Sequence, residues 1–219
     1  MREKLIKFFK SVWAYIVKAK IELIVLVGAF ALDLISKAII NSTIELGESV
    51  VLIPNFLCFT YTHNYAAAFG SAFGLDGIFN HETVMTIFIV FAFIAIVLFG
   101  FFMYRARNQK LILRIAYALI IAGAAGNLVD RMVFGYVRDF IHFIYLGLTI
   151  FGSTSFAIFN IADAALVIGV IIFLVFYLFV YKDETSEKII DKYEQDCSLK
   201  NKTEGDVPSR LDINNDNNG

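Results

Sequence analysis

Ionisable and amide side chains interrupt segments of this sequence that are otherwise apolar. Their spacings are helical: Asp33 and Lys37 lie four apart, Asn127, Asp130 and Arg131 lie at i, i+3 and i+4, and Asn160 and Asp163 lie three apart, while Asn64 and Asp139 fall in connecting segments. Polar residues of this kind are costly within a membrane and usually face a protein interior or a water-filled site. We therefore expect them to converge on one polar site.

The carboxylates carry most of the chemical information. Two carboxylates held close together share one proton, because like charges resist double ionisation. One then deprotonates a water molecule, while the other, protonated, polarises or protonates a scissile amide. Such a pair hydrolyses peptides without a metal ion or a nucleophilic serine, and the chain has no HExxH or GxSxG pattern. Cys58 and Cys197 have no Cys or His at metal-ligand spacing, so no metal and no cofactor is expected.

Structural interpretations of two of these groups stay open. Asp33 and Lys37 fit either a helix salt bridge or direct contact with substrate or water. An adjacent Arg131 favours a structural role for Asp130, since an arginine would hold that carboxylate ionised and engaged.

The remaining residues allow the same two interpretations. Asp163 fits an early helical turn, where the helix dipole favours a carboxylate. Asn64 fits the cap of a turn. The residue types alone therefore indicate an acid–base hydrolase without excluding a structural cluster.

Four long apolar segments must position these residues. About 20 apolar residues cross the hydrocarbon core of a bilayer, and the expected spans are 21–40, 83–104, 111–130 and 159–181. Hydrophobic residues make up 58% of the 219 residues, against about 45–50% in soluble domains. The expected fold class is an integral membrane, mainly α-helical protein with four transmembrane helices.

The distribution of Lys and Arg predicts the orientation. The first twenty residues hold six of these cations, the 41–82 segment holds none, and the short connection between the second and third spans holds three. The positive-inside rule then places both termini in the cytoplasm and the polar residues near the outer membrane boundary. The basic start and first apolar stretch also resemble a cleavable signal peptide. Apolar character continues to residue 40, however, so an uncleaved span is the simpler interpretation.

The segments outside the spans have their own patterns. Residues 49–61 are rich in Val, Ile, Phe, Thr and Tyr and are broken at Pro54 and Asn55, which predicts short strands and a turn in a small outer β platform over 41–82. Residues 76–82 are expected to form a short helix or loop, and the first ten residues an amphipathic helix. The predicted domains are a membrane domain over 1–181 and a polar, disordered cytoplasmic tail over 182–219.

Five short motifs resemble those of the lipoprotein signal peptidase (signal peptidase II) family. In chain order they are Asp33-Leu34-Ile35-Ser36-Lys37, Asn64-Tyr65-Ala66-Ala67-Ala68-Phe69-Gly70, Gly126-Asn127-Leu128-Val129-Asp130-Arg131, Gly135-Tyr136-Val137-Arg138-Asp139-Phe140 and Phe159-Asn160-Ile161-Ala162-Asp163. One such motif is weak evidence, but the five together, in the family's order over residues 20–181, are specific.

The resemblance implies a four-helix membrane enzyme with a small extracytoplasmic β-cradle, in which Asp139 and Asp163 form a catalytic dyad. The supporting residues it implies are Asp33, Lys37, Asn64, Asn127, Asp130, Arg131 and Asn160. It further implies an aspartic endopeptidase of the bacterial cell membrane that cleaves diacylglyceryl-modified prolipoproteins just before the lipidated cysteine. Globomycin-like cyclic peptides are the implied inhibitors, and membrane lipids, not nucleic acids, the other partners.

The chain departs from the family pattern in three places. Ala66 stands where the family often has Gly, the 143–159 connection is long and apolar, and the polar tail has no assigned role. None of these departures removes a functional group from the expected dyad.

Other functions compete with peptide hydrolysis. A transporter or channel also uses intramembrane charges, but it predicts polar residues through the whole bilayer depth, whereas the second and fourth spans carry no charge across their middles. A non-catalytic scaffold gives no reason for carboxylates gathered on one side. A lipid-modifying transferase predicts a nucleophile or a metal-binding cluster, and the sequence indicates neither.

Overall fold

A computed structural model of the chain describes residues 5–7, 9–10, 19–65, 80–146, 148–149 and 154–181. Within these residues four helices are long and apolar enough to cross a membrane. They are α2 (Lys20–Thr43), α3 (His81–Arg105), α4 (Leu111–Phe134) and α5 (Ile161–Val175), the last followed in the chain by the π-helical η3 (Phe176–Tyr181). The predicted mainly helical membrane fold is thus confirmed. Residues 5–7 and 9–10 are helical, and the predicted tail lies outside the described residues.

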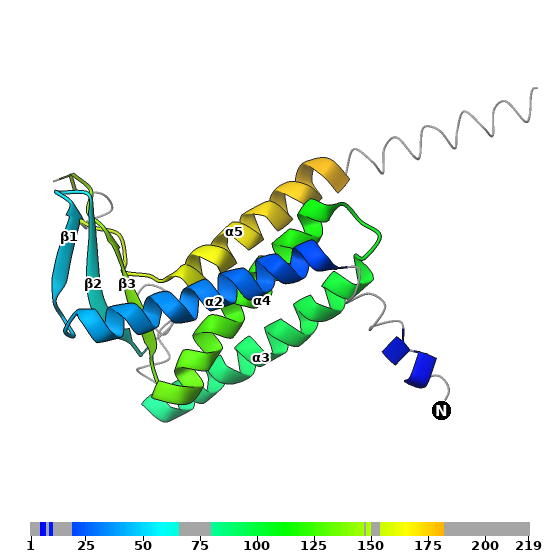
Figure 1. Cartoon of the computed structure of the whole chain (residues 1–219), viewed down its shortest axis with the longest axis horizontal. Helices are drawn as coiled ribbons and strands as arrows, with labels where there is room; N and C mark the ends of the chain where they lie inside the picture. Colours follow the sequence, from blue (N-terminus) through cyan, green and yellow to red (C-terminus); the bar gives the residue numbers. More distant parts are fainter. Residues whose placement is uncertain are drawn as a thin grey trace, which may run out of the picture. The chain divides into compact units, whose positions relative to one another are not determined.

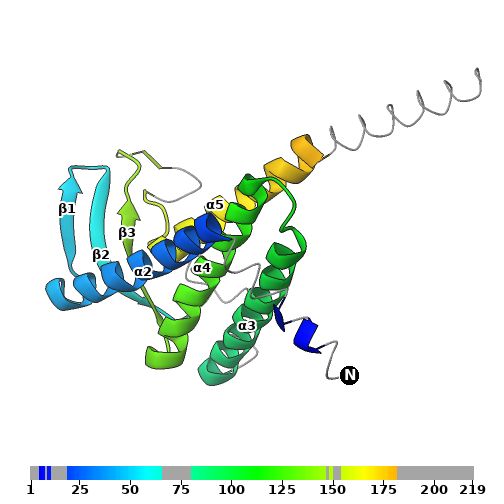
Figure 2. The same ribbon diagram turned by 45° about the vertical axis from the view of Figure 1, so that its right-hand side comes forward.

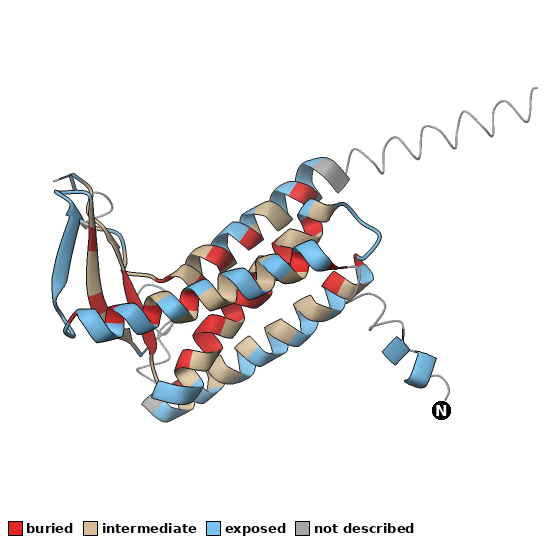
Figure 3. Ribbon diagram, viewed as in Figure 1, coloured by how far each residue is buried: buried red, intermediate tan, exposed pale blue. Residues whose placement is uncertain are grey.

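Helix α4 occupies the middle of the bundle. It packs against α2 and α3, and most of its side chains are buried, whereas few of those of the other helices are (Figure 3). Glycine allows α5 to approach it closely: a Cβ added at Gly169 would lie 2.8 Å from the carbonyl oxygen of Ala116. The exposed faces of α2, α3 and α5 are apolar, as expected of surfaces that meet lipid.

Local sequence sets several helix ends. Asn80 caps α3 by accepting a hydrogen bond from the Thr83 backbone N–H at 2.9 Å. Gly135 ends α4 in the left-handed conformation, with φ of 76°. This terminus extends the third helix four residues beyond the predicted 111–130. The fourth helix begins at Ile161, two residues later than predicted, because Asn160 is its N-cap.

A three-stranded antiparallel sheet lies at one end of the helices in both views (Figures 1 and 2). Strands β1 (Ser49–Ile53) and β2 (Leu57–Asn64) form the hairpin expected from the sequence, with Asn55 at φ of 57° in its turn. The third strand, β3 (Val137–Phe143), comes from the connection between the third and fourth spans. The sequence prediction confined the platform to 41–82 and missed this strand.

The strand register brings the sheet to the helix ends. Asn64 pairs with Val137 and Thr62 with Asp139, so the end of β2 lies beside the start of β3. A buried cluster packs the sheet against the end of α2; it consists of Ile40, Ile44, Tyr61 and Phe140. The position of Asp139 is therefore fixed by contacts with two elements distant in sequence.

Candidate active site

Asn160 and Asp163 cap the first turn of α5 reciprocally. The Asn160 side-chain oxygen accepts a hydrogen bond from the Asp163 backbone N–H at 2.9 Å, and Asp163 Oδ2 accepts one from the Asn160 backbone N–H at 3.1 Å. This is a capping-box arrangement, which satisfies two backbone donors that have no partner within the helix. Because the Asn160 oxygen is engaged in the cap, its amide nitrogen remains available to the carboxylate on β3.

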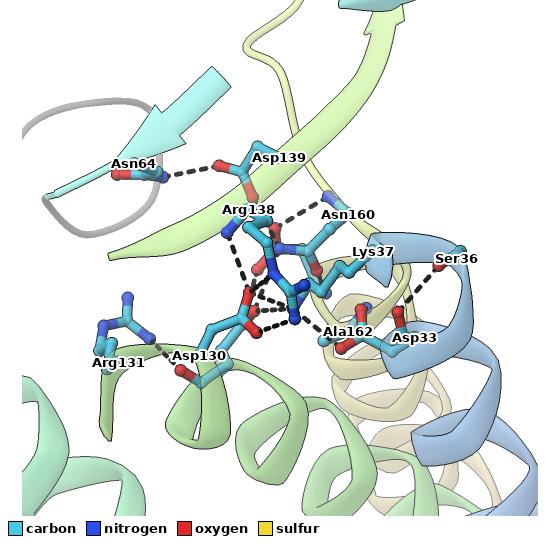
Figure 4. Close-up of polar contacts among 12 residues, drawn as sticks. Asp33, Ser36, Lys37, Asn64, Asp130, Arg131, Arg138, Asp139, Asn160 and Ala162 are labelled. Carbon is cyan, nitrogen blue, oxygen red and sulfur yellow. Dashed lines mark hydrogen bonds and ion pairs between the residues drawn. The ribbon is translucent and has the colours of Figure 1, made fainter. Parts of the chain in front are cut away.

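Asp139 is a buried carboxylate, with only 1% of its surface exposed. Its Oδ1 accepts a hydrogen bond from Asn160 Nδ2 at 2.6 Å, and its Oδ2 accepts one from Asn64 Nδ2 at 2.9 Å (Figure 4). The pKa of Asp139 is raised from 3.8 to about 7, first by burial and next by the Asp163 carboxylate, against the lowering effect of the two asparagines and Lys37. A carboxyl group with this pKa can take up or release a proton near neutral pH.

Asn127 on α4 links the two carboxylates. Its Nδ2 donates to Asp163 Oδ1 at 2.7 Å, while its Oδ1 accepts from Asn160 Nδ2 and Lys37 Nζ, each at 3.1 Å. Since an ammonium group only donates, the Lys37 contact determines which end of the Asn127 amide faces Asp163. A continuous set of hydrogen bonds therefore joins Asp139 to Asp163 through two asparagine amides.

Lys37 is a fully buried cation held by two carboxylates. Its Nζ lies 2.8 Å from Asp33 Oδ2 and 3.4 Å from Asp130 Oδ2. The other oxygen of Asp33 accepts a hydrogen bond from the Ala162 backbone N–H at 2.8 Å. Both Asp33 and Lys37 have an exposure of 0%, so the structural interpretation of this pair is favoured over direct contact with substrate.

Asp130 is engaged by an arginine that the sequence analysis did not single out. Arg138 donates three hydrogen bonds to it, from the backbone N–H at 3.0 Å, from Nε at 3.2 Å and from Nη2 at 2.7 Å. The sequence favours Arg131 as the partner of Asp130, but neighbouring residues on a helix do not face each other. The available signal was an arginine directly before Asp139 in an otherwise apolar segment.

Arg131 contacts Asn127 and Phe88. Its Nη1 donates to the Asn127 carbonyl oxygen at 3.3 Å, and its Cζ lies 5.5 Å from the centre of the Phe88 ring. The guanidinium therefore spans from α4 toward α3 at the edge of the site.

A cavity of about 410 Å³ opens onto these polar groups. Its polar lining comes from Asn64, Asn127, Arg131 and Asp163, and its apolar lining from Val137, Phe156, Ala157, Ile158, Phe159, Ala164, Leu166, Val167 and Ile168. Asp163 lines the cavity directly, and Asp139 is bonded to Asn64, which also lines it. The cavity is therefore mainly apolar, and its polar lining lies on the side of the two carboxylates.

Two other expectations concern metal binding and the outer loop. Among the described residues, no group of three or more His, Cys, Asp or Glu side chains is arranged to hold a metal ion. Cys58 is buried and unpaired, and Cys197 lies outside the described part of the chain. The residues after Tyr65 in the second motif, including Ala66, also lie outside it, as do residues 76–79 of the expected short helix.

The chain is similar to known proteins in both sequence and structure. The family model described as signal peptidase (SPase) II matches residues 25–179. The chain is 36% identical to the lipoprotein signal peptidase of Clostridium tetani over 72% of this chain and 92% of that protein. It is 38% identical to that of Staphylococcus haemolyticus over 77% and 95%, respectively. A solved structure described as a bacterial membrane enzyme superposes with a TM-score of 0.60, at 33% identity, over 75% of this chain and 90% of that one.

Proposed function

This chain belongs to the signal peptidase II family, and on that premise we propose that it removes signal peptides from diacylglyceryl-modified bacterial prolipoproteins by cutting just before the lipidated cysteine. Asp139 and Asp163 are the proposed catalytic residues of this aspartic-type enzyme. The observation that carries the assignment is Asn160, which bonds Asp139 through its amide nitrogen and caps the turn that holds Asp163 through its oxygen.

The proposed reaction uses one proton shared by the two carboxylates. The ionised carboxylate removes a proton from a water molecule, whose oxygen attacks the scissile carbonyl carbon, while the protonated carboxyl group donates its proton to the carbonyl oxygen. The tetrahedral intermediate then collapses as the leaving nitrogen takes a proton from the carboxyl group that received it from water. One hydroxyl group of the intermediate returns its proton to the other carboxylate, which restores the shared proton, and the new carboxyl group of the signal peptide ionises in water. The products are a free carboxylate on the signal peptide and a free amine on the lipidated cysteine. The proposed hydrolysis requires neither an oxidant nor a metal ion.

The remaining residues have positioning roles in this proposal. Asn64 and Asn160 hold the Asp139 carboxylate, and Asn127 holds that of Asp163. Asp33, Lys37 and Asp130 brace these asparagines and the first turn of α5, while Arg131 lines the cavity beside Asp163. The apolar part of the cavity receives the signal peptide near its end, and globomycin-like cyclic peptides compete for the same space.

The proposed setting is the bacterial cell membrane, with both termini in the cytoplasm and the site near the outer face. The positive charges of the first twenty residues and of the 105–110 connection support this orientation. A reporter enzyme active only outside the cytoplasm, fused at the C-terminus, is expected to stay inactive, and an active fusion would contradict the orientation.

The decisive experiment is cleavage of a diacylglyceryl-modified prolipoprotein by the purified chain in detergent or lipid. Wild type is expected to cleave, and Asp139→Asn and Asp163→Asn are each expected to lose activity by about a thousandfold or more. Glu45→Gln, an exposed carboxylate between α2 and β1, is the matched control and is expected to retain full activity. A well-folded Asp139→Asn or Asp163→Asn enzyme with near-normal turnover would refute the dyad, and absence of wild-type cleavage in lipid would refute the function.

A further inference from the structure

Among the described residues of β3, only Arg138 donates side-chain hydrogen bonds to a carboxylate on α4, that of Asp130. It lies directly before Asp139, and its side chain is only 9% exposed. Side chains alternate along a strand, so Arg138 and Asp139 leave β3 on different sides. Arg138 thus faces the end of α4 while Asp139 faces the asparagines.

The contact between Arg138 and Asp130 holds the start of β3 against the end of α4. The Nε and Nη2 atoms bind different oxygens of the Asp130 carboxylate, at 3.2 and 2.7 Å, and the backbone N–H of the same arginine adds a third bond at 3.0 Å. The guanidinium carbon also lies 4.5 Å from the centre of the Phe134 ring. Paired contacts of a planar guanidinium fix orientation as well as distance. Backbone and side chain together therefore fasten the first residues of β3 to the last turns of α4 (Figure 4).

The same contact balances buried charge around Lys37. Asp33, Lys37, Asp130 and Arg138 form an alternating row of negative and positive groups, all buried. Without the arginine, Asp130 would carry an uncompensated charge 3.4 Å from Lys37. That charge would draw the ammonium away from Asn127, whose amide Lys37 orients toward the catalytic site.

The geometry points to Arg138 as a positioning residue that acts on the reaction through two routes: it fixes the strand that carries Asp139, and it neutralises Asp130 so that Lys37 remains on Asn127. The inference rests on the proposed function, because it concerns turnover at the same two carboxylates. Arg138 does not itself touch the reacting atoms in this account.

The test compares Arg138→Met and Arg138→Lys in the full chain, assayed on the lipidated prolipoprotein. Arg138→Met is expected to lower kcat by about 10- to 100-fold, since a displacement near 1 Å has effects of that size, while KM changes by less than about threefold. Arg138→Lys keeps the charge but not the paired contact, so its kcat is expected to lie between that of wild type and that of Arg138→Met. Arg107→Met is the matched control: Arg107 is exposed and also lies over an aromatic ring, that of Tyr104, at 4.9 Å.

The pH profile separates positioning from a loss of folded protein. The groups that set the pKa of Asp139 are Asp163 on α5, Lys37 on α2 and the asparagines, together with burial. A loosened strand admits water and reduces the effect of burial, so the limb of the profile near pH 7 is expected to move to lower pH in Arg138→Met. Amide hydrogen exchange of 137–143 is expected to accelerate in the same variant.

Three outcomes would overturn the inference. Arg138→Met could show the kcat and the pH profile of wild type, or Arg138→Lys could show full activity. In the third outcome, Arg138→Met loses activity only in proportion to the loss of folded protein and its pH profile is unchanged. If wild type itself fails to cleave, the proposed function falls, and unchanged exchange of 137–143 in Arg138→Met would separately refute the positioning of β3.

Discussion

Asp33 on α2 accepts a hydrogen bond from the backbone N–H of Ala162 on α5 at 2.8 Å, across a separation of 129 positions. The first backbone N–H groups of a helix have no partner within it, and here a buried carboxylate of the first span supplies one. Asp163 follows Ala162 directly, so the contact places the candidate catalytic residue relative to the whole bundle. Asp33 therefore joins the first and fourth membrane helices at the site.

Gly126→Ala is expected to disturb the hydrogen bond between Asp33 and Ala162. An added Cβ would collide with the Asp33 carboxylate and lie 3.0 Å from the Ala162 side chain, so Asp33 must move away from Ala162. We expect destabilisation of about 1–3 kcal/mol and a lower kcat, measured by thermal unfolding in detergent and by prolipoprotein cleavage. Gly28→Ala on α2, which has open space around its Cβ, should be neutral or slightly stabilising. Equal behaviour of the two variants would contradict the close packing.

Substitutions of Asn160 should separate its capping role from its contact with Asp139. Asn160→Ala loses both, so it is expected to cost about 1 kcal/mol of stability and to lower kcat by about a hundredfold or more. Asn160→Ser keeps an oxygen for the cap and lacks the amide nitrogen, so it should retain stability but show the same fall in kcat. Asn80→Ala, which removes the cap of α3, is the control for lost capping with normal activity. Normal turnover in Asn160→Ser would show that the amide contact is dispensable.

The raised pKa of Asp139 predicts how its contribution to stability depends on pH. Between its ordinary value of 3.8 and about 7, the folded state holds a proton on this group that the unfolded state has released. Stability of the wild type therefore falls as pH rises through this window, and the loss is complete above about 7. Asp139→Asn lacks this titration, so its melting temperature relative to wild type should rise from pH 4 to pH 7 and then level off. A difference that is constant with pH would mean that the pKa of Asp139 is not raised.

The same pKa predicts the pH dependence of turnover. A pair that shares one proton needs one carboxyl group protonated and the other ionised, so kcat/KM is expected to follow a bell-shaped curve. The limb near pH 7 reports the pair rather than one residue, and it should move when Asn64→Ala removes a hydrogen bond that lowers the pKa of Asp139. The direction expected is toward higher pH. A rate that is flat from acid to alkaline pH would rule out the shared proton.

Removing the charges of Lys37 and Asp33 together should destabilise the bundle by less than the sum of the two single losses. Lys37→Met leaves Asp33 and Asp130 buried without the cation between them, which is expected to cost about 3–5 kcal/mol. Asp130 keeps its pairing with Arg138, so the charge left unpaired is that of Asp33. The double variant Lys37→Met with Asp33→Asn removes that charge and should be less destabilised than the sum of the single variants. Strictly additive losses in thermal unfolding would indicate that the two residues do not interact.

The amino-acid sequence determined the membrane class, the helices and the residues that approach one another. Apolar length and charge asymmetry follow from the chemistry of a bilayer, so α2, α3 and α4 could be placed to within a few residues. Helical spacing also placed Asp33 with Lys37 and Asn160 with Asp163, because contacts between positions three or four apart are local.

Only the tertiary structure decided which distant groups bond to each other. Strand β3 pairs with β2 across more than 70 positions of the chain. Neither this pairing nor the burial of Asp139 could be read from the neighbouring residues in the sequence. The engagement of Asp130 by Arg138 depends on how α4 ends and β3 begins, and the bond from Ala162 to Asp33 depends on how α5 packs beside α2. Burial and long-range hydrogen bonds are properties of the packed bundle, and they set the pKa of Asp139 to about 7, which its residue type alone does not.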